Sequence, residues 1–184
     1  MRLGKLAVLL VVGLMVWPAF AAPVILNRNL GTEPPTADPA LGEDTTSIEI
    51  IEHMFLGLVD LDENTMAPIP ELAKSWDVSE DGLTWTFHMR NDVYWVKYDP
   101  KIDKVVYDLD KDGNKRLVTA YDVEYGVKRT IDPNTGSDYA YVLYAYVLYI
   151  IKGAYEANTA DPTSPDFPAL MDAVGVKALD PFTV

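Results

Sequence analysis

The sequence predicts an α/β protein, because segments with helical spacing and segments with strand alternation follow one another along the chain. Apolar residues recur at helical spacing after Ser47 and after Thr119, whereas side chains alternate between Trp76 and Met89. The chain has 184 residues, of which 49% are hydrophobic and 23% charged. This composition is that of a globular protein with enough length to bury a sizeable core.

The N-terminus has the three parts of a secretory signal peptide. Arg2 and Lys5 precede the apolar run LAVLLVVGLMVW, and the small-residue stretch AFAA follows Pro18. An uncleaved anchor is the alternative, but an apolar run of about a dozen residues followed by a cleavage pattern favours removal. We therefore predict a signal peptide over residues 1–22 and an exported part over 23–184. The chain has no Cys, which excludes disulfides and a cysteine-linked lipid anchor.

The charge balance excludes several classes of partner. The chain carries 28 Asp and Glu against 15 Lys and Arg, for a formal net charge of −13. Such a chain repels nucleic acid and anionic lipid, and its basic residues are not clustered. Because the acids are scattered, their simplest role is solubility.

The first half of the exported part predicts a helix and then extended segments. A loop over residues 31–46 leads to a helix over 47–55, with Ser47 as its cap and Glu49 and Glu52 complementing its dipole. A strand and turn follow over 58–70, and Pro70 is predicted to open a short helical turn through Ser75.

A β-hairpin is predicted around the turn signal Glu80, Asp81 and Gly82. Trp85, Phe87 and Met89 share one face of its second strand, so one face is expected to be buried and the other wet. His88 falls on the wet face and His53 on the preceding helix; neither has a partner motif.

The second half predicts a helix from Thr119 to Ile131. Thr119 and Asp122 have the spacing of a capping box, and the cluster DPNTGSD ends the helix. A Pro-rich loop is predicted over 159–168. The closing segment VGVKALDPFTV predicts two strand segments around an Asp-Pro turn, and we expect such an ending to be the front of a longer protein.

The run YAYVLYAYVLYII, over residues 139–151, is the most apolar stretch after the signal peptide. As a helix it would rise about 20 Å, whereas a membrane span needs about 20 apolar residues. Its tyrosines follow a five-residue repeat that drifts around a helix, so they cannot form one ligand stripe. The run predicts a helix packed on several sides, with hydroxyls reaching polar neighbours.

One motif carries metal-binding chemistry. Asp108, Asp110, Asp112 and Gly113 match the first half of a calcium loop, in which alternate side chains converge on one ion. Thr119 stands where the bidentate Glu is expected. A structural Ca²⁺ in the 108–114 loop and a plain hairpin turn therefore both stay open. No nucleophile, zinc or phosphate-loop motif is present in the sequence, so we expect no enzymatic activity and no other cofactor.

Two long segments resemble a known family. PELAKSWDVSEDGLTWTFHMRNDVYW and VTAYDVEYGVKRTIDPNTGSDYA are similar to the extracellular solute-binding proteins of peptide ABC importers, of the oligopeptide- and dipeptide-binding kind. TADPA, IEHMFLGLVDLD and VKALDPFTV match as well, so the resemblance covers essentially all of 23–184. The departure lies between Trp95 and Val118, where this chain carries a longer insert.

The resemblance implies a fold and a function. Such proteins are periplasmic-binding-protein-like, two-lobed α/β receptors that close on a ligand and deliver it to a membrane permease. Members are longer than this chain, which is expected to hold only the first part of lobe one with its inserted small subdomain. The implied partners are a peptide ligand and the permease subunits, the implied location is periplasmic or extracytoplasmic, and a monomer is expected.

The resemblance also implies ligand-binding residues. The loop after Asp38 is similar to a family loop that approaches the peptide, which makes Glu43 and Thr45 candidates, and Tyr139 matches a family tyrosine at the cleft. Two alternatives stay open: a receptor of the same fold for oligosaccharide or metal chelate, and a calcium-binding secreted structural module.

Overall fold

The computed structural model describes residues 27–144 and 151–184. Contacts divide the chain into two units, Met1–Gly31 and Thr32–Val184. In the described part of the first unit, the Gly31 N–H donates to Asn29 Oδ1 at 2.9 Å. The predicted signal peptide over residues 1–22 lies outside the described residues, as does the middle of the tyrosine-rich run.

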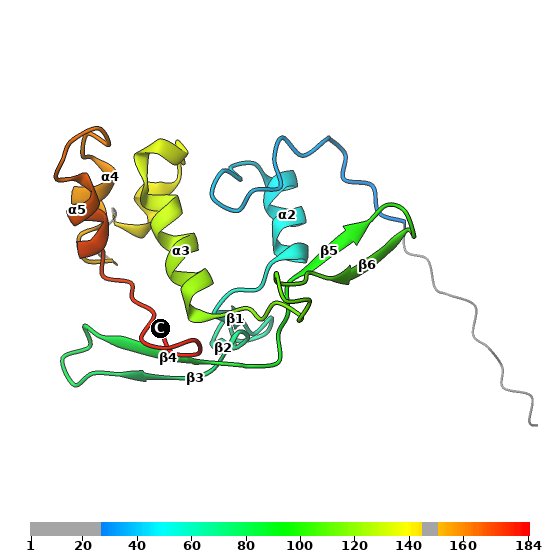
Figure 1. The fold of residues 1–184 in the computed structure, drawn as a ribbon, viewed down its shortest axis with the longest axis horizontal. Helices are drawn as coiled ribbons and strands as arrows, with labels where there is room; N and C mark the ends of the chain where they lie inside the picture. Colours follow the sequence, from blue (N-terminus) through cyan, green and yellow to red (C-terminus); the bar gives the residue numbers. More distant parts are fainter. Residues whose placement is uncertain (1–26, 145–150) are drawn as a thin grey trace, which may run out of the picture. The chain divides into compact units, whose positions relative to one another are not determined.

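The second unit mixes helices and strands, which confirms the α/β prediction (Figure 1). Its α-helices are α2 (Thr45–Met54), α3 (Ala120–Ile131), α4 (Ala154–Asn158) and α5 (Phe167–Ala173), with 3₁₀ turns η1 (Pro133–Thr135) and η2 (Ala140–Leu143). Its strands are β1 (Val59–Leu61), β2 (Pro68–Pro70), β3 (Ala73–Val78), β4 (Trp85–Met89), β5 (Val96–Asp99) and β6 (Lys104–Tyr107).

The described strands form antiparallel pairs, β1 with β2, β3 with β4, and β5 with β6. This confirms the predicted strand and turn over 58–70 and the predicted hairpin around Gly82. Of the closing segment, the second half lies beside β4, where Phe87 and Val184 exchange two backbone hydrogen bonds of 2.8 and 3.2 Å. Asp180 and Thr183 bridge each other across the predicted Asp-Pro turn.

The first predicted helix is present, but its start was placed wrongly. α2 begins at Thr45, and the Asp44 carboxylate caps it by accepting from the N–H groups of Thr46 at 3.0 Å and Ser47 at 2.9 Å. Ser47 therefore lies inside the first turn, where its side chain is buried. Glu49 and Glu52 both lie beyond that turn, so neither complements the helix dipole as predicted.

The predicted helical turn from Pro70 to Ser75 is wrong. Pro70 ends β2 and Ala73 begins β3, because the chain is held extended by two backbone hydrogen bonds, Leu72 N–H to Gly57 O at 3.1 Å and Ala73 N–H to Leu58 O at 2.9 Å. The predicted loop over 159–168 also ends early. Phe167 starts α5 with Pro168 in the first turn, where a proline has no helical hydrogen bond to lose.

The helix α3 was predicted correctly, and so was its cap. Both the backbone N–H and the hydroxyl of Thr119 donate to Asp122 Oδ2 at 2.8 Å. The turn cluster after Ile131 forms η1, which ends at Gly136 with a φ of 69°. A side chain would be strained at this left-handed φ, so glycine suits the break.

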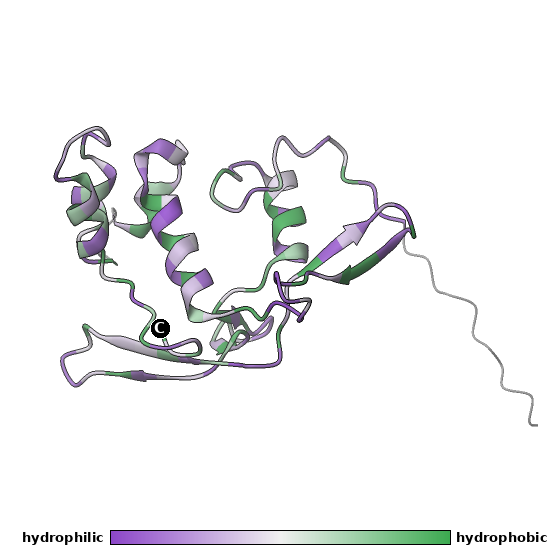
Figure 2. Cartoon of the chain, in the orientation of Figure 1, coloured by the Kyte–Doolittle hydropathy of each residue, from purple (hydrophilic) through white to green (hydrophobic). Residues whose placement is uncertain are grey.

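Two apolar clusters hold the second unit together. The first contains Ile131, Ala154, Ala157 and Val174, which join α3 to α4 and the end of α5. The second contains Leu72, Met89 and Ala120, packed by Phe182 and Val184 among others. The helix α3 contributes to both clusters and shows apolar and hydrophilic residues around its axis (Figure 2).

The tyrosine-rich run differs from its prediction where it is described. Ala140–Leu143 form a 3₁₀ turn rather than an α-helix. The Tyr144 hydroxyl donates to Asn158 Oδ1 at 2.7 Å, and the Asn158 amide donates to the Ile131 carbonyl at 2.6 Å. A hydroxyl thus reaches a polar neighbour, as expected. No helix within 27–144 and 151–184 is long and apolar enough to cross a membrane.

Candidate functional site

The loop before α2 is folded around Asp38. The Asp38 N–H donates to Thr36 Oγ1 at 3.0 Å, and the Asp38 carboxylate accepts from the Ala40 N–H at 3.0 Å. The Asp38 carbonyl accepts from Leu41 and Gly42 at 3.0 and 3.1 Å. Loops that satisfy their own backbone groups in this way are ordered without belonging to a helix or sheet.

The end of this loop is fixed by the start of α2. The buried Ser47 hydroxyl accepts from the Thr36 N–H at 3.3 Å, and Asp44 caps the helix. Glu43 and Thr45 flank the cap and are exposed. The structure therefore places these two predicted ligand-binding residues together, with side chains accessible to a ligand.

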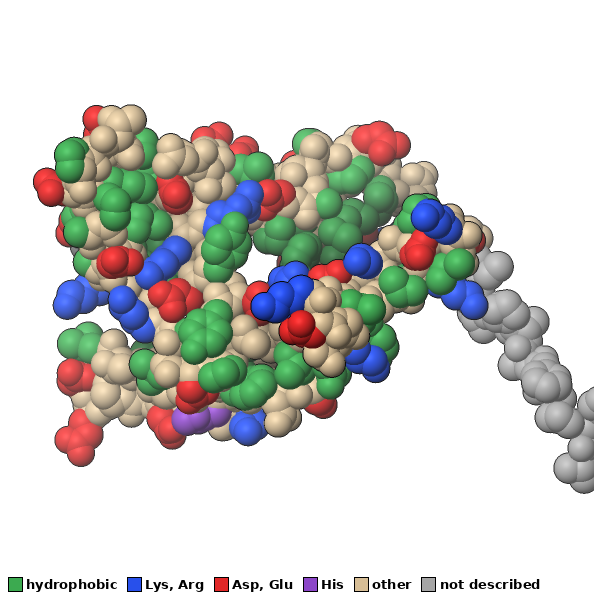
Figure 3. Space-filling view, viewed as in Figure 1, with side chains coloured by type: hydrophobic (Ala, Val, Ile, Leu, Met, Phe, Trp, Pro, Cys, Tyr) green, Lys and Arg blue, Asp and Glu red, His purple; other side chains and the backbone are tan. Residues whose placement is uncertain are grey.

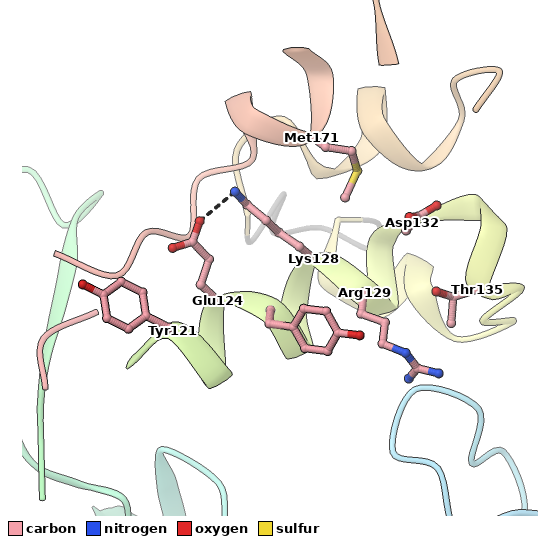
Figure 4. Close-up of a pocket in the computed structure, with 8 residues that line it drawn as sticks. Tyr121, Glu124, Lys128, Arg129, Asp132, Thr135 and Met171 are labelled. Atoms are coloured by element: carbon pink, nitrogen blue, oxygen red, sulfur yellow. Dashed lines mark hydrogen bonds and ion pairs between the residues drawn. The ribbon is translucent and has the colours of Figure 1, made fainter. Parts of the chain in front are cut away.

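Arg129 of α3 joins this loop to the helix. Its guanidinium makes a two-pronged contact with Asp38, Nη1 to Oδ1 at 2.7 Å and Nη2 to Oδ2 at 2.6 Å. Figure 4 shows Arg129 extending from α3 toward the loop. These hydrogen bonds hold the pKa of Asp38 below its usual range and raise that of Arg129. The pair is therefore ionised at neutral pH.

A pocket of about 520 Å³ lies on the same helix. It is lined by Tyr121, Glu124, Tyr125, Lys128, Arg129, Asp132, Thr135 and Met171 (Figure 4). Glu124 accepts from Lys128 at 2.7 Å and from the Ala178 N–H at 2.8 Å, and these contacts, the backbone one first, lower its pKa. Because Glu124 and Lys128 are paired with each other, the pocket offers a polar ligand mainly aromatic faces, hydroxyls and the Asp132 carboxylate.

The contacts of Tyr139 are with a different segment from the loop that carries Glu43 and Thr45. Its side chain is 44% exposed, and its ring centroid lies 5.8 Å from that of Tyr141. Within the described parts of the chain, no hydrogen bond, ion pair or ring contact joins Tyr139 to Glu43 or Thr45. The three predicted residues thus fall into a loop pair and a separate tyrosine.

Arg129 was missed by the sequence analysis. It lies 91 positions from Asp38, and nothing in the local pattern of α3 distinguishes it from Lys128. Asp38 is followed by Pro39, but Asp-Pro pairs also occur elsewhere in the sequence, so the pair was no specific signal.

The acids of the calcium-like motif have other partners in the structure. Asp108 accepts from Lys97 Nζ at 2.9 Å and Arg116 Nη1 at 3.2 Å, and Asp110 accepts from the backbone N–H groups of Asp112 and Asn114, both at 2.9 Å. Gly113 has a φ of 84°, as a tight turn requires. Across residues 27–144 and 151–184, no three His, Cys, Asp or Glu side chains are grouped to hold a metal. These contacts favour the hairpin-turn alternative, and the calcium site stays a prediction.

The surface charge agrees with scattered acids. On the face in Figure 3, acidic and basic side chains are interspersed over the helices and hairpins. Six of the charged pairs in the described residues lie partly or fully in solvent, where ion pairs contribute little to stability.

Comparison with known proteins identifies the family. Residues 67–184 match the family described as bacterial extracellular solute-binding proteins, family 5 Middle. The chain belongs to this family. Its matched region includes β3, β4 and α3, which carry the two segments quoted for the resemblance, and so the resemblance is confirmed.

Individual members give the extent of the match. The family 5 chain is 35% identical over 159 residues to the oligopeptide-binding protein OppA of Bacillus subtilis, covering 86% of this chain and 24% of that protein. It is 34% identical over 162 residues to the periplasmic oligopeptide-binding protein OppA of Escherichia coli, with the same coverage. The chain thus spans about a quarter of the length of these relatives.

A solved structure confirms the fold. The substrate-binding domain of an oligopeptide ABC transporter from Bacillus anthracis superposes with a TM-score of 0.62 at 31% identity, over 82% of this chain and 23% of that one. The predicted fold, part of a periplasmic-binding-protein-like receptor, is therefore confirmed.

Proposed function

We propose that this chain is part of an ABC-importer receptor that captures oligo- or dipeptides outside the cytoplasmic membrane and delivers them to the permease. The observation that carries this proposal is the 35% identity to an oligopeptide-binding protein across 86% of the chain. The receptor is a binding protein without catalytic chemistry, exported by its signal peptide and acting as a monomer.

The loop around Asp38 is assigned to ligand contact. The exposed Glu43 carboxylate can pair with a basic group of a peptide. The Thr45 hydroxyl can form hydrogen bonds with the main chain of that peptide. Tyr139 provides an exposed ring and hydroxyl on a second segment. Main-chain hydrogen bonds to an extended ligand tolerate many side chains, which suits a peptide importer.

Delivery follows from a population shift. A ligand that touches both lobes favours the closed receptor by its differential affinity for that form, and the permease binds the closed form. The segment described here supplies contacts from one lobe only.

Calorimetry on the complete product of the reading frame tests the proposal. A mixed peptide library should give saturable binding with a negative heat-capacity change, whereas oligosaccharides and metal chelates should give none. Titrations with EDTA should match those without it, since the peptide contacts involve no metal. Binding of sugars or chelates but not of peptides would overturn the peptide assignment and leave the fold assignment intact.

A substitution ties the proposal to the loop. Glu43→Gln should lower the affinity for peptides with a basic residue roughly tenfold, which is the size of one charge-assisted contact. The affinity for neutral peptides should stay the same. Glu80→Gln, in the distant turn of the β3–β4 hairpin, is the matched control and should bind both kinds like the parent protein. Equal losses for basic and neutral peptides would contradict a direct contact by Glu43.

A further inference from the structure

The contact between Arg129 and Asp38 has the geometry of a clamp. Two parallel hydrogen bonds of 2.7 and 2.6 Å join the planar guanidinium to both carboxylate oxygens. This two-pronged arrangement fixes angle as well as distance, which a lysine at the same position could not do.

This clamp, the ion pair between Arg129 and Asp38, holds the loop at Asp38, the residue around which the loop is folded. Asp38 also organises the backbone of Ala40, Leu41 and Gly42. Rotation of the Asp38 side chain would break its hydrogen bond from the Ala40 N–H, at the start of the turn that leads to Glu43.

On the other side of the ion pair, Arg129 belongs to a helix end that is packed and hydrogen-bonded. Arg129 is in the last turn of α3, next to the fully buried Ile131, whose carbonyl is held by the Asn158 amide. The loop is thus held in register with a well-packed helix rather than with another loop.

The exposure of the pair indicates what it contributes. The Arg129 and Asp38 side chains are 32% and 31% exposed, and ion pairs this accessible to water add little to global stability. Holding a ligand-contacting loop in place, by contrast, lowers the entropy cost of binding.

We propose that Arg129 is a positioning residue that holds the loop 38–45 in its ligand-ready arrangement through Asp38, without touching the ligand. This inference rests on the proposed function, because it takes the loop carrying Glu43 and Thr45 as ligand-contacting. It predicts a loss of affinity when the clamp is broken, with the overall fold intact.

The test compares four variants with the parent protein, all as the complete product of the reading frame. Arg129→Gln and Asp38→Asn each break the clamp, and Arg129→Lys keeps the charge but loses the fork. Thr119→Ala removes the cap of α3 and is the control for a weakened helix that leaves the clamp in place.

Two readouts are measured. Hydrogen exchange without ligand should speed up roughly tenfold at the amides of residues 40–46 in Arg129→Gln and Asp38→Asn, and calorimetry should show peptide affinity falling by about the same factor. Arg129→Lys should give exchange rates and affinities between those of these variants and those of the parent protein. Thr119→Ala should lower the melting temperature with loop exchange and affinity unchanged.

The outcomes separate the two proposals. Unchanged loop exchange in Arg129→Gln, or an equal loss of affinity in Thr119→Ala, would overturn the positioning role. If the parent protein binds no peptide, the proposed function fails, and loop exchange in the unliganded protein still decides whether Arg129 orders the loop.

Discussion

The hairpins β3–β4 and β5–β6 are alike in pairing and opposite in burial. Both are two-stranded and antiparallel. The first ends at Met89, which is 1% exposed, and gains a further extended segment along β4 from the end of the chain. The second leaves most of one face exposed; its residues are Val96 (54% exposed), Tyr98 (58%), Val105 (66%) and Tyr107 (46%), the last partly covered by Lys115 and Tyr94.

The same strand pairing thus goes with very different burial. Even within β3–β4, the predicted buried face is buried only at the Met89 end, since Trp85 is 53% exposed at the other end and stacks on Phe87 at 6.4 Å. Burial depends on what packs over the face, and that comes from distant segments such as Phe182.

The largest difference between the two hairpins is expected in the stability lost when a side chain is truncated. Met89→Ala should lower the free energy of unfolding by about 3 kcal/mol, because it opens a cavity among Leu72, Ala120 and Phe182. Urea denaturation followed by tryptophan fluorescence measures this loss. A loss below about 1 kcal/mol would show that the site collapses to fill the space and that the cluster is loosely packed.

The second largest difference between the two hairpins is expected in their response to acid. Lys97 first, and then Arg116, hold the pKa of Asp108 below its usual range, and both contacts lie at the base of β5–β6. A carboxylate with a lowered pKa stabilises the fold above about pH 4, and this contribution, which solvent screening reduces, is lost as the pH falls through the pKa of the folded state. Exchange protection of β5–β6 should therefore fall below about pH 4 through Asp108, whereas in β3–β4 the lowered pKa is that of Asp81 in the turn, caused first by the Ser79 hydroxyl. In Asp108→Asn this acid-dependent step should be absent; its persistence would assign the step to another group.

The smallest effect is expected on the exposed face. Val105→Ala should change the free energy of unfolding by about 0.5 kcal/mol or less, because little apolar area leaves water at this position. The same urea measurement compares it directly with Met89→Ala. A cost above about 1.5 kcal/mol would mean that the face is covered in the complete protein.

Local signals predicted much of the fold. The capping box at Thr119 and the apolar spacing to Ile131 gave α3 with its correct boundaries, since both lie within the helix itself. Pro70 led to a wrong prediction, because its fixed φ suits a strand end as well as a helix start. The hydrogen bond from Leu72 to the Gly57 carbonyl holds the chain extended there. α5 was hidden by Pro168 at its start.

The candidate site was predicted only in part. Glu43 and Thr45 came from the family resemblance and lie together on an exposed loop. The contact from Arg129 to Asp38 spans 91 positions, and no periodicity or spacing rule reaches that far. Positioning contacts of this kind become visible only when the helix and the loop have been placed in one fold.

The segment that runs beside β4 also sets an order of events during synthesis. Phe182 and Val184 accept backbone hydrogen bonds from Met89 and Phe87, and Pro181 accepts one from Ala120. These partners lie roughly sixty to a hundred residues apart along the chain and meet late, because the loop between them must first be closed. The β3–β4 hairpin therefore emerges well before its neighbouring segment, during synthesis or export, and until then its edge is open to pairing with other unfolded chains.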